Sequence, residues 1–167
     1  MKKKFLALLL ALAMTLALAA CGGGGAAGTI KIGGIGPLTG STAQYGIATD
    51  EGAKIAIEEI NALGGLQFEL NGQDDEADGE KGVNAYNNLM DWGMQILYGC
   101  TTSGSCAAVA AESFGDRVFQ LTPSASSTTV TEGHDNVFQL CFTDPNQGKT
   151  AADFIKDNAL ATKVAVI

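Results

Sequence analysis

The sequence predicts an α/β fold built on a parallel β-sheet with helices on both faces. Short runs rich in isoleucine, leucine and valine alternate along the chain with longer segments whose apolar residues recur every three or four positions. Connections rich in glycine, serine and threonine separate these segments. Because a helix between two strands returns the chain to the same end of the sheet, this alternation gives parallel pairing in a Rossmann-like arrangement.

The first elements are marked by clear boundaries. Residues 29–35 (TIKIGGI) are typical of a strand, and Gly36-Pro37 ends it. Apolar residues at helical spacing then run from Tyr45 to Leu63. Gly64-Gly65 stops this helix, since glycine is favoured just beyond a helix end.

The rest of the chain repeats the pattern. Residues 66–70 (LQFEL) alternate as a strand, and Asn71-Gly72 is expected to turn the chain there. A serine- and threonine-rich loop with one helical turn is expected over 122–134. The remaining elements are helix 80–92, strand 95–98, helix 105–114, strand 117–121, strand 136–142, helix 146–158 and strand 163–167. No turn signal follows the last strand, so we expect the chain to be the N-terminal part of a longer protein.

Residues 1–20 have the pattern of a secretory signal peptide. Three lysines precede an apolar run that is shorter than the roughly 20 residues needed to span a bilayer. Residues 18–21 read LAAC, which resembles a bacterial lipobox, so Cys21 is expected to carry a lipid anchor after cleavage. The glycine- and alanine-rich residues 21–28 then form a flexible tether. The alternative is an ordinary signal peptide with an incidental cysteine.

The charge of the chain argues against a nucleic-acid partner. The net charge is −8, and three of the ten Lys and Arg residues belong to the signal segment. The other basic residues are scattered, whereas binding to phosphates needs them clustered. About 140 residues follow the tether, which is enough for one domain with a core.

Two loops crowded with hydroxyl groups mark the expected ligand site. Ligands of parallel sheets bind beyond the carboxyl ends of the strands. There, Thr101, Thr102 and Ser103 lie between a strand end and a helix start, whose unpaired amides favour an anion such as a carboxylate. The alternative is plain helix capping by Ser103 or Ser105. Residues 122–127 form the second loop, and a ligand between the two would find both donors and carbonyl acceptors, as an α-amino acid needs.

Other binding motifs are incomplete. The glycines of residues 33–36 (GGIG) do not fit the dinucleotide fingerprint, and a tight turn close to a ligand or a packed neighbour explains them better. Residues 148–150 (GKT) lack the first glycine of a P-loop. His134 is the only histidine, so a catalytic triad or a histidine metal site has no support elsewhere in the chain.

The acidic and cysteine residues also have plain interpretations. Residues 74–78 could bind calcium, but no closing ligand follows and a solvated acidic loop is expected. Cys100, Cys106 and Cys141 cannot fill a zinc site of four ligands. Either Cys106 and Cys141 form a disulfide or all three are small buried residues. We expect no metal and no cofactor.

In this context the residues resemble a known family, the substrate-binding proteins of branched-chain amino acid ABC transporters, of the leucine/isoleucine/valine-binding type. The resemblance covers the chain from residue 29 onward. It rests on IKIGGIGPLTGSTAQYG (30–46), EEINALGG (58–65), YGCTTSGSCAAVA (98–110), LTPSASS (121–127) and VFQLCFTDPNQGKTAADFI (137–155).

The resemblance implies a type I periplasmic binding protein, with two Rossmann-like lobes that close on a ligand. Residues 29–141 would form lobe I, and residues 142–167 would form the hinge crossing and the first helix and strand of lobe II. Relatives supply an acidic partner for the ligand ammonium from lobe II. Some relatives also tie the acidic loop to the strand before the first hydroxyl-rich loop with a disulfide, which this chain cannot form because residues 74–78 contain no cysteine.

The resemblance also implies the ligand residues. Tyr45 would line the cleft, and Thr102 would bind the α-carboxylate. Ser124 and Ala125 would offer backbone and wall to the ligand. Ser126 would contact both the carboxylate and the ammonium.

The function implied is that of a monomeric, lipid-anchored solute receptor outside the cytoplasm that hands an amino acid to an ABC permease. It is not expected to be an enzyme. A ligand sensor of the same fold is one alternative, and a fused transmembrane signalling segment would distinguish it. A secreted α/β enzyme is another alternative, but no general base supports it.

Overall fold

The computed structural model describes residues 28–165. The predicted signal peptide and the predicted lipid-anchor residue Cys21 lie outside the described residues, as do residues 166 and 167. The elements are β1 (Ile30–Gly36), α2 (Ala43–Ala62), β2 (Phe68–Asp74), α3 (Gly79–Trp92), β3 (Ile96–Gly99), α4 (Ser103–Asp116), β4 (Phe119–Thr122), the 3₁₀ turn η1 (Thr128–Val130), β5 (Val137–Gln139) and α5 (Asp144–Asp157). Their order follows the predicted alternation of strands and helices.

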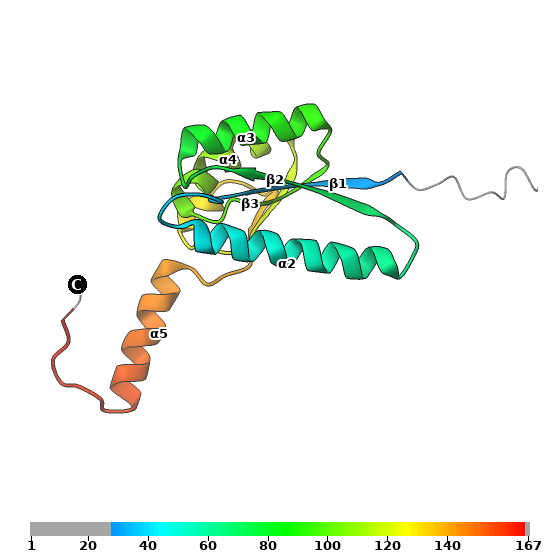
Figure 1. The fold of residues 1–167 in the computed structure, drawn as a ribbon. Coiled ribbons are helices and arrows are strands. Elements are labelled where there is room, and N and C mark those ends of the chain that lie inside the picture. The colour runs from blue at the N-terminus through cyan, green and yellow to red at the C-terminus, as the bar shows by residue number, and fades with distance from the viewer. Residues whose placement is uncertain (1–27, 166–167) are drawn as a thin grey trace, which may run out of the picture.

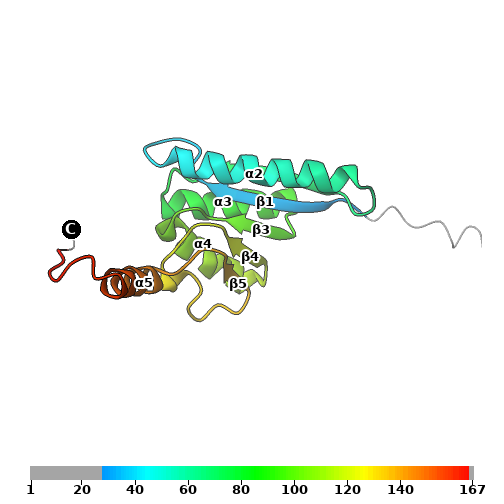
Figure 2. The ribbon, with the colours of Figure 1, turned by 90° about the horizontal axis from the view of Figure 1, so that it is seen from below.

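The five strands form one parallel sheet in the order β2-β1-β3-β4-β5. Helices α3 and α4 cover one face, and α2 lies along the other (Figure 1). The view from below shows α2 extending along β1, with β4 and β5 to one side of it (Figure 2). The predicted α/β class, with a parallel sheet and helices on both faces, is confirmed.

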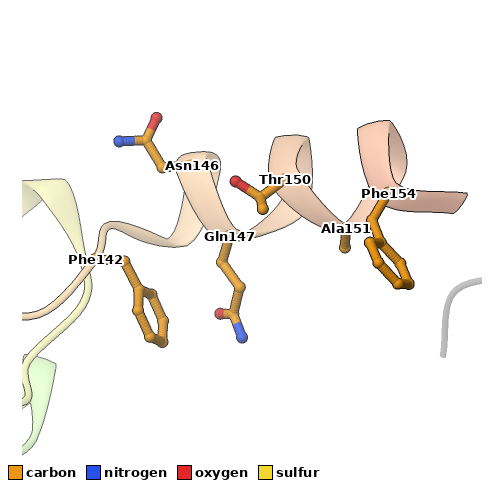
Figure 3. A pocket seen from close by; sticks show the side chains of 6 residues that line it. All are labelled: Phe142, Asn146, Gln147, Thr150, Ala151 and Phe154. Atoms are coloured by element: carbon orange, nitrogen blue, oxygen red, sulfur yellow. The ribbon is translucent and has the colours of Figure 1, made fainter. Parts of the chain in front are cut away.

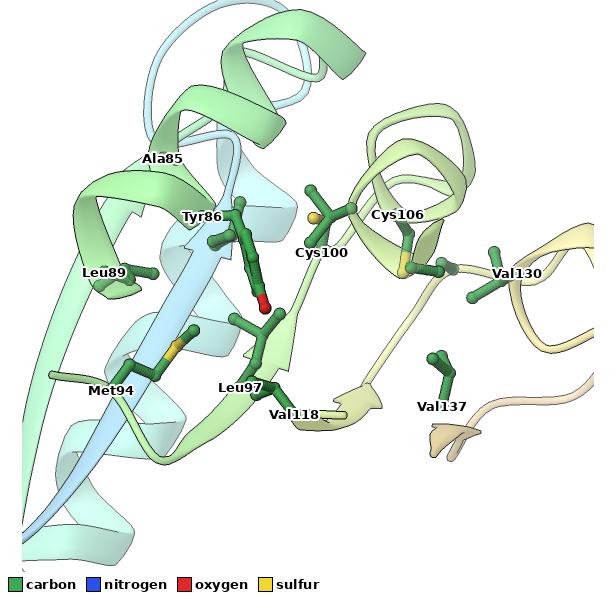
Figure 4. Close-up of a cluster of buried hydrophobic side chains, with 14 residues drawn as sticks. Ala85, Tyr86, Leu89, Met94, Leu97, Cys100, Cys106, Val118, Val130 and Val137 are labelled. Carbon is green, nitrogen blue, oxygen red and sulfur yellow. The ribbon is translucent and has the colours of Figure 1, made fainter. Parts of the chain in front are cut away.

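The hydrophobic core lies between the sheet and the pair α3 and α4 (Figure 4). Tyr86 and Leu89 enter it from α3, Leu97 from β3 and Val109 from α4, and each is at most 1% exposed. Local signals fix the ends of α3. Asp78 caps its start, and a glycine with left-handed backbone follows its end.

The turn predicted at Asn71-Gly72 is wrong, because β2 continues through both residues to Asp74. Gly72 pairs with Gly34 in the ladder between β1 and β2. A Cβ atom on Gly72 would lie 2.6 Å from the carboxylate oxygen Oδ1 of Asp50 on α2. The glycine therefore allows the helix to approach the sheet closely, and a glycine with this role looks the same in sequence as a turn residue.

The predicted strand 136–142 is shorter in the structure, where β5 ends at Gln139. Beyond it, the chain bonds to the last residue of β4 and to the loop that follows. Leu140 donates its amide to the carbonyl of Thr122, and Asp144 donates to the carbonyl of Ser126. The chain thus leaves the sheet beside the second hydroxyl-rich loop.

The predicted strand 163–167 is not formed over its described residues, 163–165. A strand needs a neighbour to satisfy its backbone, and no strand of the described chain lies beside these residues. The preceding helix α5 projects away from the sheet (Figure 1). No helix within residues 28–165 is both long enough and apolar enough to cross a membrane.

Candidate functional site

Two hydroxyl-rich loops meet where β3 and β4 end. We call Thr101–Ser103 and Ser124–Ser126 together the cradle. Ser103 lies at the first position of α4, and its Oγ accepts hydrogen bonds from the amides of Ser126 (3.1 Å) and Ser127 (3.2 Å). Sequence reasoning considered Ser103 only as a capping or anion-binding residue. The structure instead uses its hydroxyl to join the two loops.

Thr102 is the capping residue of α4, with an extended backbone, but its side chain makes no capping hydrogen bond. Its Oγ1 is buried and has no hydrogen-bonding partner within the described chain. Buried hydroxyls are normally paired, since leaving one unpaired costs about 1–3 kcal/mol. An unpaired hydroxyl at a helix start is an arrangement that a ligand can complete.

The first turn of α4 adds positive potential to this hydroxyl. A helix start carries unpaired amides and a partial positive charge. The first turn of α4 itself contains no acidic residue, and the Asp75 carboxylate that reaches this turn is hydrogen-bonded to Ser105. The predicted capping role of Ser105 is not found, because Thr102 takes the capping position. The local field therefore favours an anion beside Thr102.

Thr122, the last residue of β4, holds the second loop in place. Its Oγ1 donates to the carbonyl of Cys100 (2.7 Å) and accepts from the amide of Ala125 (3.0 Å). Ala125 is 1% exposed, and its carbonyl accepts from the side chains of Gln139 and Cys141. Both backbone groups of Ala125 are thus engaged within the protein.

Ser126 has a hydroxyl available for a ligand. Its amide donates to Ser103, and its carbonyl accepts from the amide of Asp144. Its hydroxyl has no partner among the described residues, and neither does that of Ser124. The structure therefore places the predicted residues Ser124 and Ser126 with free hydroxyls in the loop that is bonded to Ser103.

The two remaining residues predicted to bind the ligand, Thr101 and Tyr45, differ in exposure. Thr101 is 3% exposed, and its Oγ1 lies 3.3 Å from the hydroxyl oxygen of Thr49 on α2. This hydroxyl already has a partner within the protein. Tyr45, in the first turn of α2, is 54% exposed and free to contact a ligand.

The expectation that the acidic loop is solvated is wrong for Asp75, which is 0% exposed. Its carboxylate accepts from Ser105 Oγ (2.6 Å) and from the amide of Ala77 (2.9 Å). Burial raises the pKa of Asp75, and the hydrogen bond from Ser105 only partly offsets this effect. Residues 28–165 contain no group of acidic, histidine or cysteine side chains arranged to hold a metal.

The suggested disulfide between Cys106 and Cys141 is not formed, since Cys100, Cys106 and Cys141 are all free. Cys100 and Cys106 are fully buried, and burial raises the pKa of the Cys100 thiol. Gln120 donates a hydrogen bond to the sulfur of Cys106. These two cysteines act as small core residues, as the other interpretation of the sequence expects, whereas Cys141 is only half-buried.

The glycine-rich first strand serves close packing. A Cβ atom on Gly34 would lie 2.4 Å from the Tyr98 ring, and one on Gly36 would lie 2.5 Å from Thr101 Oγ1. The expected close approach to a packed neighbour is confirmed, but the expected tight turn is not formed, because residues 33–36 lie within β1. His134 packs against the Phe114 ring, and its Nδ1 lies 3.2 Å from the carbonyl oxygen of Val130.

A separate apolar groove runs along α5 (Figure 3). Its walls include Phe142 and Phe154, which are 59% and 60% exposed. Its polar lining residues, Asn146, Gln147 and Thr150, carry no charge, and the groove follows the length of α5 instead of meeting a helix start. The groove therefore does not provide the anion site that the cradle offers.

Comparison with known proteins identifies the family. Residues 29–167 match the family model described as "Periplasmic binding protein". The chain belongs to the periplasmic binding protein family. It is 36% identical over 142 residues to the Leu/Ile/Val-binding protein homolog 3 of Brucella melitensis, covering 83% of this chain and 39% of that protein. The leucine-, isoleucine-, valine-, threonine- and alanine-binding protein of Pseudomonas aeruginosa is 36% identical over 148 residues, covering 85% of this chain and 39% of that protein.

Solved structures of this periplasmic binding protein family share the fold. The branched-chain amino acid transporter substrate-binding protein LivJ of Streptococcus pneumoniae, in complex with isoleucine, is 34% identical with a TM-score of 0.72, covering 77% of this chain and 38% of that one. The leucine-binding protein LivK of Thermotoga maritima is 30% identical with a TM-score of 0.72, covering 78% of this chain and 38% of that one. The chain thus spans about two fifths of the length of these relatives.

Proposed function

We propose that this chain belongs to the extracytoplasmic solute-binding component of an ABC importer, and that it binds the α-carboxylate of a branched-chain or similar amino acid. The observation that carries the proposal is the buried, unpaired hydroxyl of Thr102 at the start of α4. The relatives named for binding leucine, isoleucine and valine support the choice of ligand class.

The proposed binding chemistry follows from the contacts of the cradle. The α4 amides and Thr102 Oγ1 donate to the ligand carboxylate. The Ser126 hydroxyl contacts both the carboxylate and the ammonium, because it can donate and accept. Tyr45 covers the ligand from α2, and Ser124 adds a second hydroxyl. Thr101 and Ala125 support these groups without binding the ligand through hydrogen bonds. The Thr101 hydroxyl and both backbone polar groups of Ala125 already have partners within the protein.

We also propose that residues 29–141 form lobe I and that residues 142–167 begin the crossing to lobe II. The last strand of the five-stranded sheet ends at Gln139, and α5 projects away from that sheet. Both observations support this division. The proposed whole protein is a monomer anchored by lipid at Cys21, and it delivers its ligand to a membrane permease. The proposed role is binding and delivery, without turnover.

Isothermal titration calorimetry of the purified protein with L-isoleucine tests the function. Benzoate, which has a carboxylate but no ammonium, is the matched probe. We expect isoleucine to bind and benzoate to bind more weakly, because only isoleucine presents an ammonium to Ser126. Thr102→Val removes a hydroxyl with little change in shape, and the expected loss of affinity is about tenfold or more.

Thr128→Val is the matched control, because Thr128 is exposed on η1 and outside the cradle. It should bind isoleucine like the unchanged protein. Equal affinities of the Thr102→Val and Thr128→Val variants would exclude Thr102 as a ligand contact. Tighter binding of benzoate than of isoleucine would exclude the amino acid and leave an aromatic carboxylate as the ligand.

A further inference from the structure

Two consecutive aspartates, at the end of β2 and just beyond it, hold the loop before α2 and the first turn of α4. Asp75 points inward and accepts the hydrogen bond of Ser105 Oγ at 2.6 Å, and both residues are 0% exposed. Ser105 lies in the first turn of α4, two residues beyond Ser103. Asp75 also donates its amide to the carbonyl of Gly36, at the end of β1. This aspartate therefore connects the end of β1 to the start of α4.

Asp74 holds the loop between β1 and α2. Its Oδ1 accepts from the amide of Leu38 at 2.8 Å, and its Oδ2 accepts from Thr39 Oγ1 at 2.6 Å. This loop leads into the first turn of α2, which carries Tyr45. Neither aspartate has a cation as an ion-pair partner among the described residues. Their hydrogen bonds all go to neutral groups of the surrounding loops and of α4.

The packing around Ser105 leaves little room for movement. Gly82 on α3 faces it, and a Cβ atom at that position would lie 2.4 Å from Ser105 Oγ. The hydroxyl is thus held between α3 and the Asp75 carboxylate. Ser103 Oγ accepts hydrogen bonds from the amides of Ser126 and Ser127. The position of the first turn of α4 therefore also sets the position of the second loop.

We propose that Asp74 and Asp75 are positioning residues for the proposed ligand site, which consists of the cradle and Tyr45. Asp75 fixes the first turn of α4 through Ser105, and Asp74 fixes the loop before Tyr45 through Leu38 and Thr39. Neither aspartate contacts the ligand. The proposal rests on the proposed function for its consequence in ligand affinity, but the positioning itself can be measured without a ligand.

Amide hydrogen exchange of the ligand-free protein, followed by NMR, provides the test. The variants are Ser105→Ala, Asp75→Ala, Asp75→Asn and Asp74→Ala. Ser105→Ala and Asp75→Ala should exchange the amides of Ser126 and Ser127 about tenfold faster, because a hydrogen bond to a charged group is lost. Asp75→Asn keeps an acceptor for Ser105 and should restore slow exchange. Asp74→Ala should release the amide of Leu38 in the same way.

Ser113→Ala is the matched control. Ser113 is also a buried serine of α4, but it lies near the C-terminal end of the helix. Its Oγ donates a 2.6 Å hydrogen bond to the side chain of Gln120 on β4. This variant should leave the amides of Ser126 and Ser127 unchanged. If Ser105→Ala and Ser113→Ala have the same effect on these amides, the hydrogen bond to Asp75 is merely structural and the proposal is wrong. Ser105→Ala keeps the test decisive if Asp75→Ala does not fold.

Isoleucine titration of the same variants separates this proposal from the proposed function. Ser105→Ala should lower isoleucine affinity about tenfold, and Ser113→Ala should leave it unchanged. Fast exchange in Ser105→Ala, together with no isoleucine binding by the unchanged protein, supports positioning and rejects the proposed ligand. Isoleucine binding that is unaffected by Ser105→Ala and Asp74→Ala would overturn the positioning role.

Discussion

The hydroxyl groups at the ends of β3 and β4 have different roles although they are neighbours. Thr122 Oγ1 satisfies a carbonyl and an amide that would otherwise be buried without partners. Thr101 Oγ1 pairs with Thr49 across to α2. Thr102 Oγ1 is buried and unpaired within the described chain. This contrast supports our proposal that Thr102 is a ligand contact, where the protein forgoes stability in favour of binding.

The contrast predicts opposite effects of the same substitution on the ligand-free protein. Thr122→Val should lower the free energy of unfolding by about 1–3 kcal/mol, because two buried backbone groups lose their partner. Thr102→Val should leave it unchanged or raise it by about 1 kcal/mol, since an unpaired hydroxyl is removed. Urea unfolding measures both values. A loss of stability in Thr102→Val as large as that in Thr122→Val would mean that the Thr102 hydroxyl is bonded in solution.

Asp74 and Asp75 are adjacent, but we expect their contributions to the free energy of unfolding to have opposite pH dependences. Burial opposes the charge of Asp74, but its hydrogen bonds from Thr39, Glu76 and Leu38 outweigh burial, so its pKa lies below the ordinary value of 3.8. Asp74 thus contributes stability that is present above pH 3.8 and is lost as the pH falls through its folded pKa. Burial raises the pKa of Asp75, so its contribution is present below pH 3.8 and is lost as the pH rises through its folded pKa.

Urea unfolding between pH 3 and pH 7 checks this sign difference. The stability of the unchanged protein relative to Asp74→Asn should shrink as the pH falls. Relative to Asp75→Asn, it should grow over the same range. Parallel slopes for the two comparisons would contradict the assigned environments.

At the scale of elements, close approach between α2 and the loop after β1 depends on glycine. A Cβ atom on Gly46 would lie 2.0 Å from the carbonyl oxygen of Pro37, which is a backbone atom that cannot rotate away. Gly52, in the same helix, has nothing within 4 Å of the corresponding position. The helix therefore contains one glycine that packing requires and one that it does not.

Alanine substitution of the two glycines should have opposite results. Gly46→Ala should destabilise the protein by about 2–3 kcal/mol or more, because overpacking forces a backbone shift. Gly52→Ala should stabilise it by about 0.5–1 kcal/mol, since alanine favours the helix. Thermal unfolding followed by circular dichroism measures both. A neutral Gly46→Ala variant would show that α2 is not held this closely against the loop after β1.

At the scale of the whole molecule, the two faces of the sheet differ. Helices α3 and α4 bury one face, whereas α2 covers β1 and β2 on the other. Phe119 on β4 and Phe138 on β5 stack on each other, and they are 45% and 47% exposed. The α2 side of the sheet therefore leaves apolar side chains of β4 and β5 partly exposed to solvent.

The lipid anchor is a prediction for the whole protein in its cell. If Cys21 is lipidated, the protein should enter the detergent phase on phase separation in a nonionic detergent, because the acyl chains are apolar. The Cys21→Ser variant should stay in the aqueous phase. Cys141→Ser is the matched control and should behave like the unchanged protein. Recovery of the unchanged protein in the aqueous phase would reject the anchor.

The order of elements was readable from sequence because helix and strand periodicities are local properties. The same holds for the two hydroxyl-rich loops, since the carboxyl ends of parallel strands meet at one edge of the sheet. Errors arose where a local signal had a distant cause. Asn71-Gly72 resembles a turn, yet Gly72 is needed because Asp50 approaches from α2.

The sequence by itself determined the parallel α/β architecture and the edge of the sheet where a ligand should bind. Only the tertiary structure decided which hydroxyls are free. Thr101 and Thr102 are adjacent and chemically identical, but the first pairs with Thr49 and the second has no partner in the described chain. Likewise, only packing buries Asp75 against Ser105. Pairing and burial depend on contacts between residues that are far apart in the chain, and a local pattern carries no information about them.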